Sequence, residues 1–218
     1  MFSVTYYGYA ALLLHFEKLV LIDPGIIQGK PLVETSNVCA SFILVSHTHP
    51  ENLGNTVNHA IDNGTMVIGN PQVIEEVQHQ GAPGYYLETL QTGEVFDTKA
   101  DVTITAHELR HSGFVAPRNT AFLITSSQGS VLHLGHAKEY AALRNSCPDL
   151  LCVPVAGKKK GTLDPSGAAD ATLAIQPRYV LAICGDTNQN NDFLSLLSKQ
   201  SSSVKPIAPE TGKTYKIR

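Results

Sequence analysis

Short apolar runs separated by turn residues dominate the hydrophobic pattern of this chain. In the first half they predict strands at residues 3–7, 11–16, 19–22 and 42–46, and the first three are close enough to form an antiparallel meander. The pattern then changes to helix and strand in alternation, with helices at 51–61 and 71–80 around a strand at 65–69. Pro71 suits the first turn of the second helix.

The second half repeats this order. It predicts strands at residues 102–106, 121–126 and 130–134, then a helix, a strand at 150–155, a helix at 165–175 and a strand at 179–183. Asp164 and Pro165 suit the N-cap and first turn of the last helix. Two halves that each run from meander to helix–strand units predict two mixed sheets packed face to face, a four-layer αββα sandwich. No linker divides the chain, so we expect one domain over residues 1–218.

Composition narrows the classes of function. The chain has 218 residues, of which 43% are hydrophobic, so it can bury a full core. A net charge of −3 without a basic stripe argues against nucleic acid or an anionic membrane as a partner. Four widely spaced cysteines indicate reduced thiols, and the N-terminus has no basic segment before an apolar core. We therefore expect a cytoplasmic protein.

A cluster of potential metal ligands follows the strand at 42–46. The sequence reads His47-Thr48-His49-Pro50-Glu51-Asn52, and two imidazoles one residue apart at a strand end can converge on one ion. Pro50 places the carboxylate and the amide that follow on the first turn of a helix. Taken alone, the His-x-His pair favours the simpler interpretation, two histidines on a polar surface loop.

Further ligand-type residues follow other predicted strands. His107 and His111 come after the strand that ends at Ala106, His136 follows the strand at 130–134, and Cys184 follows the strand at 179–183. Loops at strand ends commonly carry functional residues. The recurrence indicates one site built from several strand ends.

These segments, in this order, resemble the metallo-β-lactamase fold superfamily, nearest its compact lactonase-like branch. Asp23-Pro24 resembles the end of that branch's first hairpins, His47 to Asn52 its His-x-His-x-Asp-His motif, and His111-Ser112 its third-histidine segment. The resemblance covers nearly the whole chain. It implies the αββα fold, a divalent metal ion and hydrolysis of a small ester, lactone or phosphoester.

The departures from the family pattern all fall on the ligands of its second metal. Glu51 and Asn52 replace the Asp-His pair, His136 replaces the bridging aspartate, and Cys184 or Gly185 replaces the last histidine. An imidazole cannot span two ions as a carboxylate does. We therefore expect one ion, held by His47, His49 and His111 with His136 as fourth ligand, most simply zinc, with manganese or iron as alternatives.

Three states of this site remain open on the sequence. With His136 outside the coordination sphere, water takes the open position and Glu51 acts as the catalytic base. With His136 as a ligand the site is closed and structural, and with no metal the histidines are polar residues of a cleft. Further candidates for ligands or for residues that support them are Asn52, Cys184, His107 and Asp23.

Lysines 158–160 form a charged run after Gly157. The default interpretation is a solvated turn, and the alternative is that Lys158 or Lys159 binds an anionic group of a small-molecule substrate, as Arg110 or Arg118 could. The alternative to a hydrolase is an inactive family member that keeps the fold and serves as a binding protein. For the oligomeric state we take a homodimer as the working expectation.

Overall fold

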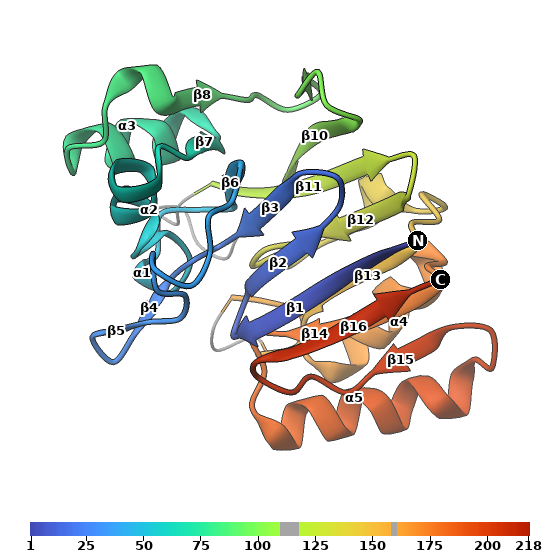
Figure 1. Ribbon diagram of the computed structural model, residues 1–218. Coiled ribbons are helices and arrows are strands. Elements are labelled where there is room, and N and C mark those ends of the chain that lie inside the picture. The colour runs from blue at the N-terminus through green and yellow to red at the C-terminus, as the bar shows by residue number, and fades with distance from the viewer. Residues whose placement is uncertain (110–117, 158–160) are drawn as a thin grey trace.

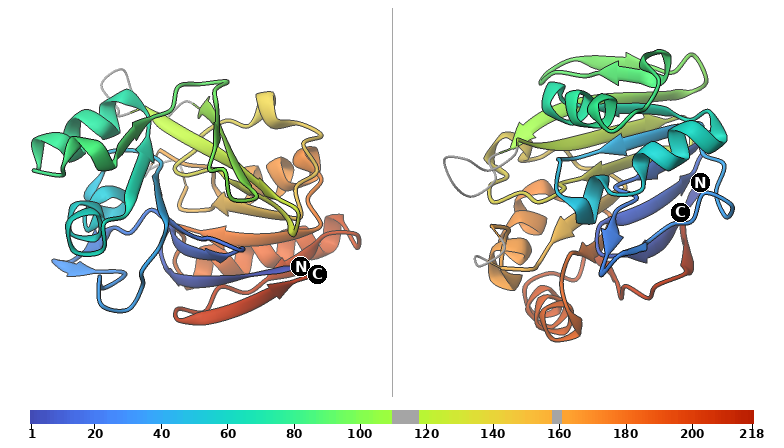
Figure 2. Two further views of the ribbon diagram at one scale, coloured as in Figure 1. Left: turned by 45° about the horizontal axis from the view of Figure 1, so that its top comes forward. Right: turned by 90° about the vertical axis from the view of Figure 1, so that its left-hand side faces the viewer.

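The computed structural model describes residues 1–109, 118–157 and 161–218. Two seven-stranded mixed sheets make up its centre, with a small two-stranded sheet, β4 (Ile26–Ile27) and β5 (Lys30–Pro31), beside them. Figures 1 and 2 show that the N-terminal and C-terminal helices lie on opposite sides of these sheets. Within the described ranges, no helix has the length and apolar composition needed to cross a membrane.

The first sheet combines an antiparallel meander with parallel strands. β1, β2 and β3 are antiparallel neighbours, and β3, β6, β7 and β8 run parallel. The last strand, β16, pairs with β1, so the two termini lie side by side (Figure 1). The strands in sheet order are β16 (Lys213–Ile217), β1 (Phe2–Gly8), β2 (Ala11–His15), β3 (Leu19–Ile22), β6 (Phe42–Val45), β7 (Met66–Gly69) and β8 (Leu87–Thr89).

The second sheet repeats this plan. β9 to β12 are antiparallel, and β12 to β15 are parallel. Its strands in sheet order are β15 (Lys205–Ile207), β14 (Tyr179–Ile183), β13 (Leu150–Pro154), β12 (Gly129–His133), β11 (Asn119–Ser126), β10 (Val102–Leu109) and β9 (Val95–Asp97). The predicted strands all occur, with ends shifted by a few residues at most.

Three apolar layers hold the sandwich together. One lies between the sheets and includes the fully buried side chains of Leu12, Ile22 and Phe122. A second packs the outer face of the first sheet against α1 (Pro50–Leu53), α2 (Thr56–Asn63) and α3 (Pro71–His79), and a third packs the second sheet against α4 (Pro165–Ile175) and α5 (Thr187–Gln200). Burial of apolar faces on both sides of each sheet confirms the αββα prediction.

The prediction of one helix over residues 51–61 is wrong, because the chain forms two helices there. The break falls at Gly54, where a Cβ would lie 2.7 Å from the backbone nitrogen of Ile26. Asn55, the next residue, donates its backbone N–H to the Pro24 carbonyl at 2.9 Å. The segment that follows β3 thus packs into the break and takes a hydrogen bond that a continuous helix would have used.

The helix expected between residues 134 and 150 is also absent. This described segment contains only a 3-10 turn, Ala141–Leu143, with one buried side chain, and a second 3-10 turn lies at Gly84–Tyr86. Conversely, the 14-residue α5 was not predicted, because its sequence is largely polar. Its signal was the N-terminal capping box, in which the Asp186 side chain accepts from the Gln189 backbone and the Gln189 side chain accepts from the Asp186 backbone.

Candidate metal centre

The carboxyl end of β6 presents the two histidines of the His-x-His motif. His47 is fully buried and His49 half-buried, and the extended backbone of His49 leads directly into α1 at Pro50. Nε2 of His47 and Nδ1 of His49 lie 3.1 Å apart. Two nitrogens bound to one tetrahedral zinc at 2.0–2.1 Å are roughly 3.3 Å apart, so this pair fits two ligands of one ion.

A third imidazole comes from the other sheet. His136 follows β12 and is buried, and its ring centroid lies 4.5 Å from that of His47. The potential ligand nitrogens of His47, His49 and His136 all lie within 4.8 Å of one another, and they are the only such group of His, Cys, Asp or Glu among the described residues. Imidazole donors gathered in this way suit a divalent ion such as zinc.

A fully buried carboxylate supports the first histidine. Asp23 Oδ1 accepts the Ser46 backbone N–H at 2.7 Å, and Oδ2 accepts from the Ser46 hydroxyl and the Asn52 side-chain amide, both at 2.7 Å. Ser46 Oγ also lies 2.9 Å from Nδ1 of His47. Since the Ser46 proton goes to Asp23, its oxygen accepts from His47 Nδ1–H, and the lone pair of Nε2 faces the cluster.

Burial raises the pKa of Asp23 to about 7, although the hydrogen bonds from Ser46 and Asn52 oppose that shift. A cation held by the nearby histidines would favour the ionised carboxylate. Asn52 supports this carboxylate by donating its side-chain N–H to Asp23 Oδ2. Its Oδ1 is buried and has no hydrogen-bond partner among the described residues.

Glu51, the expected base, is half-buried on the first turn of α1. Its carboxylate is close enough to Tyr9 to affect the pKa of that phenol. The sequence did not predict Tyr9 as a residue of the site. Burial first, and then the nearby Cys184, Glu51 and Asp23, raise the pKa of the Tyr9 phenol, so the hydroxyl stays protonated.

Tyr9 occupies a constrained position beside the histidines. Its ring meets that of His136 edge-on at 5.3 Å, and its φ of 53° lies in the left-handed region. Such backbone is costly outside glycine and clusters at functional sites. The turn between the first two strands was visible in the sequence, but nothing there connected Tyr9 with His136.

The other candidates lie at the margins of the cluster or outside the described chain. His107 lies on β10 and pairs with Ala121 of β11. Its side chain points to the outer face of the second sheet, since that of Ala106 belongs to the layer between the sheets. Cys184 packs in that inner layer, and its backbone N–H donates to the Tyr9 carbonyl at 2.9 Å. Arg118 Nη1 lies 3.9 Å from the Glu108 carboxylate, and both side chains are exposed. Arg110, His111, Lys158 and Lys159 lie outside the described residues.

His133 lies near the cluster in sequence but is satisfied by the backbone. Its Nε2 is 3.2 Å from the Ala10 carbonyl, and its Nδ1 accepts the Gly135 N–H at 3.2 Å. This pairing assigns a neutral ring with its proton on Nε2. Burial lowers the pKa of His133 to about 4, so the native protein keeps this imidazole neutral.

This burial predicts an acid-sensitive contribution to stability. His133 titrates near 6.5 when unfolded and near 4 when folded, so its contribution is present above pH 6.5 and is lost as the pH falls toward 4. Lowering the pH from 7 to 5 should therefore reduce the free energy of unfolding by about 2 kcal/mol through this residue. Urea unfolding of the wild type and of His133→Gln at both pH values measures it. The pH dependence of the wild-type stability is insufficient by itself, because the raised pKa of Asp23 stabilises the protein as the pH falls. If the free energy of unfolding changed equally with pH in the two proteins, the assignment of His133 would be contradicted.

Comparison with known proteins agrees with this architecture. The sequence model of the family described as "Beta-lactamase superfamily domain" matches residues 3–184. A protein named UPF0173 metal-dependent hydrolase from Pyrobaculum islandicum is 25% identical, over 99% of this chain and 100% of that protein.

Solved structures show the same fold. The metallo hydrolase Igni18 from Ignicoccus hospitalis superposes with a TM-score of 0.85 at 17% identity, over 100% of this chain and 99% of that one. The metallo-beta-lactamase fold protein YhfI from Bacillus subtilis gives 0.78 at 14% identity, over 99% and 100%. The match of the family model to most of the chain shows that this protein belongs to the beta-lactamase superfamily domain family.

Proposed function

We propose that this protein is a metal-dependent hydrolase that holds one divalent ion, best matched by zinc, with His47, His49 and His136. The observation that carries the proposal is the gathering of three imidazoles from both sheets, with ligand nitrogens within 4.8 Å. The names of relatives such as the Pyrobaculum protein support the same activity class. His111 lies outside the described residues and stays a prediction. Because four protein ligands would close the site, the hydrolase proposal takes three histidines and leaves the fourth position to water.

We propose a separate role in hydrolysis for the metal ion and for each residue around this cluster. A bound divalent ion supplies a Lewis acid that polarises the substrate and lowers the pKa of water to roughly 7. Glu51, on the half-buried first turn of α1, is proposed to accept the proton from the attacking water. Asp23 and Ser46 hold His47 in the tautomer that a ligand needs.

The substrate class that we propose is a small ester, lactone or phosphoester. We propose Tyr9 as the donor of a hydrogen bond to the oxygen that becomes negative, because its ring lies 5.3 Å from that of His136 and burial keeps its phenol protonated. Arg118 remains proposed as a cation for an anionic substituent. It lies 3.9 Å from the Glu108 carboxylate, and the cavity of about 130 Å³ that both line has none of the three histidines in its lining. Lys158 and Lys159 remain proposed for the same task.

Metal analysis and turnover together test this function. Protein purified without chelator should contain about one equivalent of a transition metal, and it should hydrolyse an aryl ester or bis(p-nitrophenyl) phosphate. Dialysis against a chelator should abolish turnover, and added zinc or manganese should restore it. A protein that binds metal but turns over neither substrate class would favour the binding-protein alternative. Less than about a tenth of an equivalent, unrestored by added metal, would exclude the metalloenzyme.

Replacement of Glu51 by glutamine separates catalysis from metal binding. Because glutamine keeps the shape but cannot accept the proton, we expect kcat to fall by about 10²- to 10⁴-fold with the metal content unchanged. Glu75→Gln, at an exposed glutamate of α3, is the control and should retain full turnover. Loss of metal in Glu51→Gln would instead make Glu51 a ligand.

A further inference from the structure

We infer that Asn119 is a positioning residue for the candidate metal centre, which fixes the turn carrying His136 so that its imidazole meets those of His47 and His49. Asn119 is the first residue of β11 and is fully buried. It was not among the residues that the sequence singled out. The inference rests on the proposed function, since it concerns how the chain prepares that centre for a metal.

One amide group holds both ends of the turn after β12. Asn119 Oδ1 accepts the backbone N–H of His136 at 2.8 Å, and Asn119 Nδ2 donates to the Leu134 carbonyl at 3.0 Å. Neither contact involves the imidazole, so the side chain acts on the backbone that aims it. A residue whose ring must meet two others needs its backbone fixed to within about 0.5 Å.

The middle residue of the turn is confined on two sides. Gly135 has a φ of 58°, and a Cβ at this position would lie 2.3 Å from Asn119 Oδ1 and 2.8 Å from Ser46 Cβ. The turn therefore lies between Asn119 and the segment that precedes His47. Only glycine permits this approach at a positive φ.

The next residue of β11 holds the ligand segment of the other sheet. Thr120 donates its backbone N–H to the Ser46 carbonyl at 2.8 Å, directly before His47. Consecutive residues of β11 thus contact the segments that bear His136 and His47. Because these ligands belong to different sheets, this junction sets their relative position.

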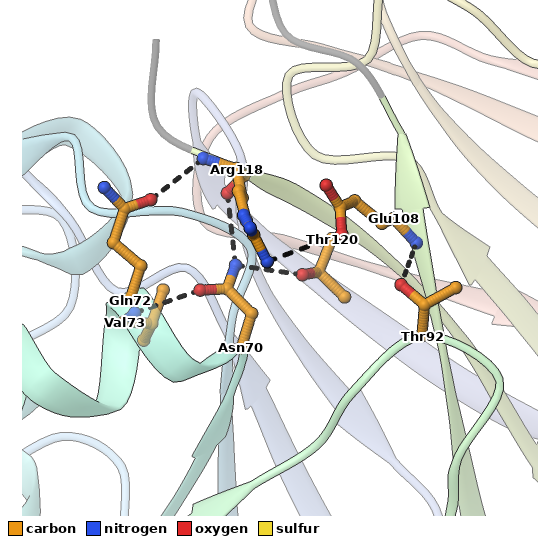
Figure 3. Close-up of polar contacts among 7 residues, drawn as sticks. All are labelled: Asn70, Gln72, Val73, Thr92, Glu108, Arg118 and Thr120. Carbon is orange, nitrogen blue, oxygen red and sulfur yellow. Dashed lines mark hydrogen bonds and ion pairs between the residues drawn. The ribbon is translucent and has the colours of Figure 1, made fainter. Parts of the chain in front are cut away.

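Asn70, the N-cap of α3, provides a matched control that contacts the same strand. It is also buried, and it links the first sheet to β11 by donating Nδ2 to the Arg118 carbonyl and to Thr120 Oγ1, both at 3.1 Å (Figure 3). Its Oδ1 accepts the Val73 N–H at 3.0 Å and caps α3 (Figure 3). None of its hydrogen bonds reaches residues 134–136. Its removal therefore reproduces the loss of a buried amide at the same junction, and it keeps both hydrogen bonds of Asn119 to residues 134–136.

The test compares Asn119→Ala with Asn70→Ala in the full chain. We expect both substitutions to lower the melting temperature of the metal-free protein, since each removes a buried hydrogen-bonded amide. Only Asn119→Ala should weaken zinc binding, by about 10- to 100-fold in a chelator competition. With cobalt in place of zinc, only Asn119→Ala should shift the absorption bands, which report ligand geometry.

The outcomes separate this inference from the proposed function. If the wild type binds neither zinc nor cobalt, the proposed metal centre fails. If the wild type binds metal and the two variants retain affinity, or lose it equally with unchanged spectra, only the role of Asn119 is overturned. If Asn119→Ala does not fold, Asn119→Asp and Asn70→Asp replace the pair. Aspartate keeps the acceptor for His136 N–H but not the donor to Leu134, so a smaller loss confined to position 119 is expected.

Discussion

Replacement of His47 by alanine is expected to abolish stoichiometric zinc binding and, with it, hydrolysis. His47 contributes an imidazole at the centre of the cluster, 3.1 Å from His49 and within ring contact of His136. Loss of a direct ligand should cost more than loss of a supporting residue, so affinity should fall by more than about 100-fold. Titration against a chelator and metal analysis of the purified variant measure the effect.

His59→Ala is the matched control for that experiment. His59 is also fully buried, but it lies on α2, and its Nε2 is 3.1 Å from the Val33 carbonyl. It does not belong to the group of three histidines. The control should lose stability and keep its metal. Stoichiometric zinc in His47→Ala, or equal loss in both variants, would contradict the assignment of the centre.

Gly25→Ala is expected to have the largest effect on stability at the site. A Cβ on Gly25 would lie 1.8 Å from the Glu51 carbonyl oxygen and 2.7 Å from the Asn52 nitrogen. Both are backbone atoms, so no rotamer change relieves the clash and α1 must move. We expect a loss of about 3 kcal/mol or more in the free energy of unfolding of the metal-free protein, measured in urea.

The same displacement should reach the metal centre. Asp23 lies two residues before Gly25 and accepts the Asn52 amide, so movement of α1 loosens the carboxylate that supports Ser46 and His47. The zinc affinity of folded Gly25→Ala protein should therefore be lower than that of the wild type. Gly84→Ala is the control, since a Cβ there meets nothing within 4 Å, and it should change stability by less than about 0.5 kcal/mol. Equal stabilities of the two variants would show that the approach of Gly25 to α1 is not tight in solution.

Local patterns in the sequence were sufficient to predict much of the fold. Each strand is marked in the sequence by a short apolar run and by the turn residues on either side of it. The sequence therefore predicts elements such as β6 and β14 close to their true ends. The repeated order of meander and helix–strand units predicted the sandwich. Polar elements such as α5, and the pairing of β16 with β1, left little trace in the hydrophobic pattern.

By itself, the sequence determined that residues able to bind a metal follow several strands, and that one short segment brings two histidines together. Only the tertiary structure decided that His136 joins His47 and His49 and that Asp23 holds Ser46. It also decided that Tyr9 contacts the ring of His136 and that Asn119 accepts its backbone N–H. The physical reason is that hydrophobic periodicity specifies which face of a strand is buried. The contacts across the junction of two sheets depend on how those sheets stack, and no local pattern along the chain records that arrangement.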